Sequence, residues 1–151
     1  MNVFPLAQPE ISALGWTHAI EIDFSDLSDT AGTTKTIAIL SVALGDVVLA
    51  AGMRLNTAFD FSDAGITSLL VELGIGGATA AIMPQKQLAV DGTEILAFVT
   101  TAATATMPMT FEAADTIDAL FTVANGGSPL LSETTSGKVT IFLRIGKLLL
   151  N

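Results

Sequence analysis

The sequence predicts an all-β fold, an antiparallel β-sandwich of about eight strands with a jelly-roll-like arrangement. Several segments alternate apolar and polar side chains with a period of two, and clusters of Gly, Asp, Asn and Ser separate these segments. No segment sustains the 3.6-residue apolar period of a helix. Parallel strands need long crossover connections, usually helical, so we expect antiparallel pairing with edges protected by closure or by a double layer.

The longest predicted strand covers residues 45–60, and the other strands are expected to pack around it. Its odd positions are mostly apolar and should form one continuous inward face: Val47, Leu49, Ala51, Met53, Leu55, Thr57 and Phe59. The even face holds the small residues Val48, Ala50 and Gly52. We expect this even face to contact a second packed layer or a neighbouring subunit.

The remaining elements follow from the same signals. Residues 1–15 contain Pro5 and Pro9 and should form an extended N-terminal arm, 16–146 the sandwich domain, and 147–151 an apolar C-terminal tail. Seven further strands are predicted, at 16–24, 34–44, 67–73, 94–100, 107–113, 117–124 and 138–145.

Turns and irregular segments separate these strands. The apolar phase changes within 34–44, which indicates either a β-bulge or burial on both faces. We expect 80–90 to be irregular because it contains Pro84, and Asp91-Gly92 and Asn125-Gly126 to form tight turns. The sequence also allows a short helix over 115–120.

Composition limits the classes of function. A chain of 151 residues fits one domain whose core needs no metal or disulfide, and it contains no Cys. A net charge of −9 with only six Lys and Arg provides no basic surface for nucleic acid. Apolar runs are too short or too polar to span a membrane as a helix. Neither nucleic acid nor a membrane is therefore an expected partner.

The shortage of charge points instead to a protein partner. Hydrophobic residues make up 50% of the chain and charged residues 14%, against about 25% charged in an average domain. A small domain has much surface to cover, so part of that surface should be buried in an oligomer or a larger assembly.

The single histidine, His18, is the first candidate for chemistry. It lies between Trp16 and Ile20 on the apolar face of the first predicted sandwich strand. No Ser or Cys nucleophile motif accompanies it, so we interpret it as a packed, hydrogen-bonded residue and expect no catalytic set.

The tetrapeptide Asp-Phe-Ser-Asp occurs twice, after two predicted strands. Its carboxylates, Asp23, Asp26, Asp60 and Asp63, are candidate ligands for a hard cation such as Ca²⁺. Neither copy has the spacing of an EF-hand, and Asp and Ser also cap turns without a metal. We favour the turn interpretation and expect no metal and no cofactor.

Two other patterns suggest binding sites but lack essential parts. The Gly-rich segment 74–77 follows a strand, as a phosphate-binding loop would, but lacks the Lys-Ser/Thr of a P-loop. The 15 Asp and Glu residues could include a glycosidase-like pair, but one Trp and no Tyr argue against a sugar platform. We interpret 74–77 as a flexible turn.

Apolar side chains at both chain ends are the best candidates for a contact with other subunits. Three leucines in the tail would be a liability on an exposed surface, although they could also fold back onto the core. We prefer an intersubunit contact. Its candidate residues are Val3, Phe4, Leu6, Leu148, Leu149 and Leu150.

One stretch resembles a known class of proteins. A turn at Gly45-Asp46 leads to a strand that ends Thr57-Ala58-Phe59-Asp60, then a short loop and a strand that ends Leu73-Gly74. This pattern resembles small structural proteins of tailed-phage virions, among them decoration, cement and fibre-like β-sandwiches. The resemblance covers a minor part of the chain. It implies a virion component, a trimer standing on or between subunits of the major capsid protein.

The leading hypothesis is therefore a non-enzymatic phage virion protein, a capsid decoration or cement protein that binds sister copies and the capsid lattice. A tail, neck or fibre protein that binds a receptor is the first alternative. A calcium- or carbohydrate-binding β-sandwich module is the second.

Overall fold

The computed structural model describes residues 1–5, 15–88, 96–99, 108–126 and 129–148. These residues form ten strands and two short 3₁₀ helices. The elements are β1 (Asn2–Pro5), β2 (His18–Asp23), η1 (Phe24–Asp26), β3 (Thr34–Val42), β4 (Asp46–Phe61), β5 (Ser68–Ile75), β6 (Ala78–Gln87), β7 (Leu96–Val99), β8 (Met109–Thr110), β9 (Asp115–Ala124), η2 (Leu131–Glu133) and β10 (Thr134–Lys147).

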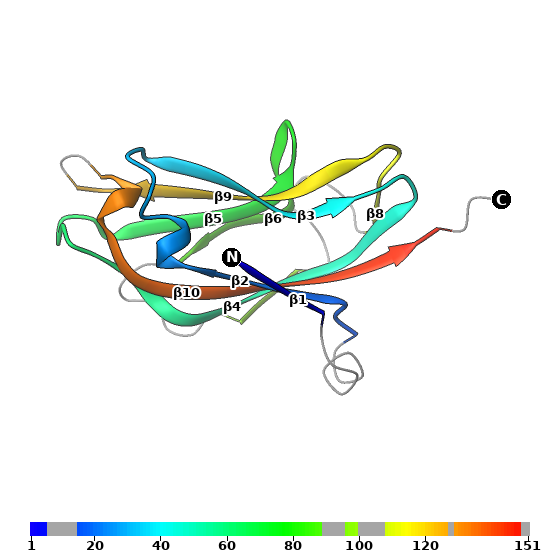
Figure 1. The fold of residues 1–151 in the computed structure, drawn as a ribbon, viewed down its shortest axis with the longest axis horizontal. Coiled ribbons are helices and arrows are strands. Elements are labelled where there is room, and N and C mark those ends of the chain that lie inside the picture. Colours follow the sequence, from blue (N-terminus) through cyan, green and yellow to red (C-terminus); the bar gives the residue numbers. More distant parts are fainter. Residues whose placement is uncertain (6–14, 89–95, 100–107, 127–128, 149–151) are drawn as a thin grey trace.

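The strands form two antiparallel sheets. The six-stranded sheet has the order β1-β2-β10-β4, with β7 and β8 both pairing along β4, and the four-stranded sheet has the order β3-β9-β5-β6. Figure 1 shows these sheets as two layers, the four-stranded sheet above and the six-stranded sheet below. The predicted all-β antiparallel sandwich is confirmed.

The pairing is that of a jelly roll. The chain forms a long folded ribbon of antiparallel pairs, β2 with β10, β3 with β9, β4 with β7 and β5 with β6. The ribbon then wraps so that β10 also meets β4 and β9 also meets β5. This wrapping brings β4 beside β10, although many residues separate the two strands in the sequence.

All eight predicted strands have a counterpart, and β1 and β6 are additional. β1 lies within the predicted N-terminal arm, at the edge of its sheet, where the missing N–H of Pro5 is tolerated. The prediction that 80–90 is irregular was wrong for the part up to Gln87. Pro84 fits into β6 because β6 is an edge strand and its pairing with β5 is irregular beside Pro84.

Residues 115–120 form part of β9, so the helix that the sequence allowed there is wrong. The side chains alternate strictly from Ile117 onward, with Ile117, Ala119 and Phe121 fully buried. β9 lies between β3 and β5 and pairs with both along most of its length. Pairing on both sides fixes an extended backbone, whatever the local preference.

β4 confirms the predicted long strand but not its continuous odd face. Ala51, Met53 and Phe59 point into the core, whereas Leu49 and Thr57 are exposed. The register with β10 skips Leu49 and Asn56 and shifts again across Gly137, so the alternation changes phase more than once along β4. A β-bulge adds one residue to one strand and moves all following side chains to the opposite face.

The bulge at Leu49 also changes which even-numbered residues of β4 face outward. Val48 is fully buried and belongs to the core, not to the outer face. Gly52 is buried and Ala50 half-buried, while Arg54 and Asn56 are exposed. The outer side of β4 is therefore partly covered and partly solvated.

β3 contains the bulge that the sequence indicated. Its register with β9 skips Ile39, and both Ile39 and Val42 are buried. The strand ends at Val42, and Leu44, which the sequence placed within this strand, is 54% exposed.

The core lies between the two sheets and draws on every large strand. Its largest fully buried side chains are Phe59, Phe121, Ile20, Ile22, Leu27, Ile39, Met53, Leu55, Ile66, Leu69, Leu73 and Ile82. Burying each of them contributes roughly 1.5–3 kcal/mol. No helix among the described residues is long and apolar enough to cross a membrane.

Candidate functional site

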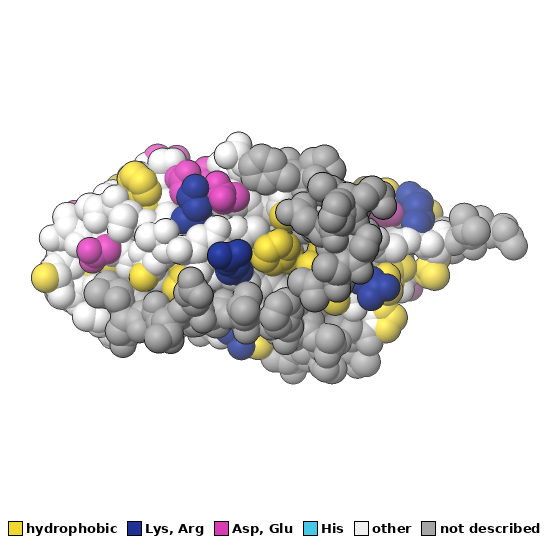
Figure 2. Space-filling view, turned by 90° about the horizontal axis from the view of Figure 1, so that it is seen from below, with side chains coloured by type: hydrophobic (Ala, Val, Ile, Leu, Met, Phe, Trp, Pro, Cys, Tyr) yellow, Lys and Arg dark blue, Asp and Glu magenta, His cyan; other side chains and the backbone are white. Residues whose placement is uncertain are grey.

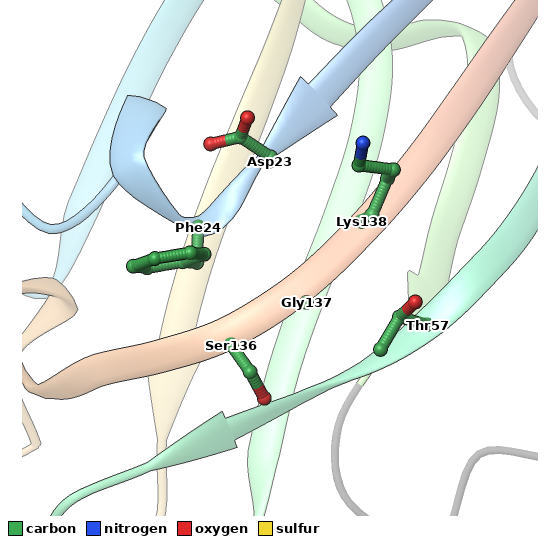
Figure 3. Close-up of a pocket in the computed structure, with 6 residues that line it drawn as sticks. All are labelled: Asp23, Phe24, Thr57, Ser136, Gly137 and Lys138. Atoms are coloured by element: carbon green, nitrogen blue, oxygen red, sulfur yellow. The ribbon is translucent and has the colours of Figure 1, made fainter.

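An open groove of about 280 Å³ lies where β2, β4 and β10 run side by side. Figure 3 shows that β2 brings Asp23 to its rim, β10 brings Lys138, and Thr57 comes from β4. The lining residues are Asp23, Phe24, Thr57, Ser136, Gly137 and Lys138.

Gly137 explains how the groove forms. Its φ of +132° is a conformation that side-chain-bearing residues rarely adopt, and a Cβ here would lie 2.3 Å from Cδ1 of Phe59. The register between β10 and β4 is irregular on both sides of Gly137. β10 therefore presses against the ring of buried Phe59 and leaves Ser136 and Thr57 beside an open space.

The charged groups of the groove are already engaged within the chain. Asp23 accepts hydrogen bonds from the hydroxyl and the N–H of Ser25, at 2.6 and 2.8 Å, and these bonds hold the pKa of Asp23 below its ordinary value. Lys138 lies 3.0 Å from Glu21, and this carboxylate raises the pKa of Lys138. The hydroxyls of Thr57 and Ser136 and the 38%-exposed ring of Phe24 are left to contact a ligand.

The first Asp-Phe-Ser-Asp copy forms a capping box. Asp23 caps η1 through the N–H of Ser25, and Asp26 accepts a hydrogen bond from the N–H of Asp23 at 3.0 Å. Asp26 also forms an ion pair with the ammonium group of Met1. Both carboxylates therefore have local partners.

The second copy makes turn contacts of its own. Asp60 accepts from the N–H of Phe61 and Asp63 from the N–H of Gly65, each at 2.8 Å. Within the described ranges, no group of three or more His, Asp and Glu side chains could hold a metal ion. The structure thus gives all four candidate carboxylates local partners.

His18 is half-buried and bonded to its neighbour. Its Nδ1 lies 2.9 Å from Oγ1 of Thr17, which donates to the carbonyl oxygen of Leu143 and accepts from the N–H of Ile145. A hydroxyl has one proton to donate, so these contacts are all satisfied when His18 donates through Nδ1. Burial lowers the pKa of His18. The imidazole thus helps to join β2 to β10.

The predicted interface residues are placed only in part. Val3 and Phe4 lie in β1, and Leu148, which is 48% exposed, follows the end of β10. Leu6, Leu149 and Leu150 lie outside the described residues. β1 pairs with 18–21 of β2, whereas the end of β10 pairs with the start of β4, so β1 and Leu148 lie in different parts of the sheet.

Three cationic side chains lie on the outer face of the six-stranded sheet. Arg54 of β4 and Arg144 of β10 are exposed there, with Lys138 along the same strand as Arg144. Figure 2 shows Lys and Arg side chains spread over this face among hydrophobic and acidic ones.

Two acidic residues that sequence reasoning passed over lie on the opposite sheet. Glu72 of β5 is only 9% exposed, and one carboxylate oxygen of Asp118 in β9 is buried. The available signal was an acidic residue within the apolar run Val71-Glu72-Leu73. An ionisable side chain in such a run is either exposed on a solvated face or requires a partner.

No family model matches this chain, and no curated protein matches it in sequence. Among solved structures, it is similar to a chain of the "Cyanophage Pam1 capsid asymmetric unit". The two are 18% identical, with a TM-score of 0.53 over 83% of this chain and 79% of the other. The nearly equal coverage means that the chains are of similar length. The likeness shows that the two share a fold.

Proposed function

We propose that this chain is a non-enzymatic structural protein of a phage virion, a capsid decoration or cement protein. The observation that carries the proposal is the shared fold with a chain of similar length in a phage capsid asymmetric unit. The local engagement of His18 and of the Asp-Phe-Ser-Asp carboxylates supports a role without catalysis.

The mechanism would be adhesion. A two-layer sandwich with buried hydrophobic side chains on both inner faces is a rigid body that presents its outer faces and edges. Each contact with a sister copy or with the major capsid protein would be modest, and many repeated contacts would add up through multivalency. A trimer would give each unit three such attachments.

Composition supports this mechanism. The low share of charged residues, 14%, fits a surface that is partly covered in an assembly. The net charge of −9 would keep decorated particles apart through like-charge repulsion.

Electron cryo-microscopy of purified particles tests the proposal, combined with deletion of the coding sequence. We expect density of this size at regular positions on the head and, after deletion, heads that break at lower temperature or in low-salt buffer. Density at the tail, or heads of unchanged stability after deletion, would contradict the decoration role.

The groove favours one second candidate, a receptor-binding tail or fibre component that recognises a glycan. Phe24 offers an apolar platform beside the hydroxyls of Thr57 and Ser136, an arrangement that suits a sugar ring. A glycan array with the purified protein tests this candidate, with Phe24→Ala as the matched loss-of-platform variant. Retained glycan binding by that variant would exclude the groove.

A further inference from the structure

Glu72 and Asp118 point to the outer face of the four-stranded sheet. Glu72 lies between Val71 and Leu73, which are fully buried in the core, and side chains on a strand alternate between faces. By the same reasoning Asp118, in the alternating strand β9, faces outward. Glu72 pairs with Leu120 and Asp118 with Gly74, so the two acids are diagonal neighbours, roughly 7–8 Å apart.

Glu72 is buried and Asp118 is half-buried, and neither has a partner among the described residues. Glu72 is 9% exposed, and the buried Oδ1 of Asp118 has no hydrogen bond. Neither side chain forms a hydrogen bond or an ion pair with another residue in the part of the chain that the structure describes. An ionised carboxylate that loses water without gaining a counterion is strongly unfavourable, and a second carboxylate nearby adds repulsion.

The chain's own cations do not neutralise this pair. All six Lys and Arg residues lie within the described ranges. Three of them form ion pairs elsewhere: Lys35 with Asp29, Lys138 with Glu21, and Lys147 with Asp46. Arg54 and Arg144 belong to the other sheet, and Lys86 of β6 forms no ion pair with either acid.

The backbone beside the pair is closely packed. At Gly74, opposite Asp118, a Cβ would lie 2.0 Å from the carbonyl oxygen of Ala78 and 2.5 Å from that of Thr79. The β5–β6 hairpin therefore turns over Gly74, and Figure 1 shows this hairpin rising from the upper sheet. Carboxylate oxygens accept hydrogen bonds but donate none, so the two acids suit a group that only donates.

Arginine and lysine side chains are such groups, and both carry the required positive charge. A metal ion is the less suitable occupant, since the described residues include no group of three acidic or His side chains able to hold one. A second copy is less suitable at this corner as well, because three of its six Lys and Arg side chains already form ion pairs within their own chain.

We propose that the outer face of the four-stranded sheet is a docking surface on which Glu72 and Asp118 receive an Arg or Lys side chain of a partner protein. The inference rests on the proposed function for the identity of that partner, a different subunit of the virion. The charge complementarity itself does not depend on that function.

The first experiment uses the isolated protein. Three samples are compared by NMR: the wild type, the double variant Glu72→Gln/Asp118→Asn, and Glu112→Gln, which makes the same chemical change at an exposed site. A capped Arg-Gly repeat peptide should shift the amide signals around residues 72, 74 and 118 in the wild type and in the control, but not in the double variant. Absence of these shifts in the wild type would overturn the inference.

Thermal melting tests whether the carboxylates of Glu72 and Asp118 lack partners within the chain. The double variant should melt at the same temperature as the wild type or a few degrees higher, because it removes uncompensated charge. A clearly lower melting temperature would mean that the carboxylates have partners within the chain, which would overturn the inference. Stabilisation by CaCl₂ in the wild type but not in the double variant would assign the corner to a metal and would also overturn it.

The second experiment uses virion heads that lack this chain. The wild type and Glu112→Gln should bind them, and the double variant should bind about 30-fold more weakly, as expected for loss of a buried charge pair. Equal binding by all three would overturn the docking surface.

If the wild type fails to bind heads while the peptide shifts persist, the docking surface stands and the proposed virion function fails. Self-association of the wild type that the double variant loses would identify a second copy as the occupant and overturn the proposal.

Discussion

Replacement of Gly137 by alanine should destabilise the sandwich severely. Gly137 lies within β10, opposite the buried ring of Phe59, and adopts a φ of +132°. A methyl group at this position would lie 2.3 Å from Cγ and Cδ1 of Phe59 and 2.7 Å from its Cα. Ordinary contacts between carbon atoms are roughly 3.5–4.0 Å, so either the ring or a strand must move.

Two effects determine the expected magnitude. A residue with a side chain in this region of φ costs of order 1–3 kcal/mol. Overpacking a filled core costs about 1–3 kcal/mol more. The sum, about 2–6 kcal/mol, is a large fraction of the roughly 5–15 kcal/mol that stabilises a typical domain. The melting temperature should fall by on the order of 10 °C.

Urea unfolding and calorimetry measure this loss, and two other glycines supply matched controls. Gly77 has a φ of +80° with no atom within 4 Å of a Cβ, so Gly77→Ala should show only the backbone cost, about 1 kcal/mol. At Gly32 the φ is not positive and the nearest atoms are 3.8 Å away, so Gly32→Ala should be nearly neutral. A Gly137→Ala loss no larger than that of Gly77→Ala would refute the reasoning.

Three further predictions concern single side chains. Because burial lowers the pKa of His18 from 6.5, stability should decline as the pH falls below that value, and His18→Gln should remove this part of the decline in thermal melts. Ser25 holds the pKa of Asp23 below its ordinary value, so the contribution of Asp23 should be complete above about pH 4 and lost as the pH falls through the lowered value. In an acid titration followed by circular dichroism, the wild type should then unfold at a lower pH than Asp23→Asn. Coincident curves would contradict this. Thr134 is buried and donates to the carbonyl oxygen of Leu131 at 2.7 Å, so Thr134→Val should cost about 1 kcal/mol in urea unfolding, whereas the exposed Thr135→Val should change little.

The strands could be predicted because their signal is local. Alternation in β10 and β9, and the turn residues between strands, indicate extended segments without knowledge of their partners. β6 was missed because Pro84 is an unfavourable strand residue in the sequence, and only its place at a sheet edge makes it acceptable.

The candidate site was harder to predict from the sequence than the strands were. The two Asp-Phe-Ser-Asp segments suggested cation ligands, although the local sequence favoured a turn interpretation. In the structure their carboxylates make capping and turn contacts. Glu72 and Asp118 did not stand out, because they are far apart in the sequence and become neighbours only through the pairing of β5 with β9.

The strand at 45–60 shows which features follow from the sequence and which follow from the tertiary structure. The sequence alone determined that this segment is a long strand with apolar side chains, because period-two alternation is a property of neighbouring residues. Only the tertiary structure decided which of those side chains face the core, since the bulges at Leu49 and Asn56 arise from its register with β10. Gly137 follows the same rule: the predicted strand began only at Lys138, and the ring of Phe59 across the sheet makes Gly137 a required glycine within β10.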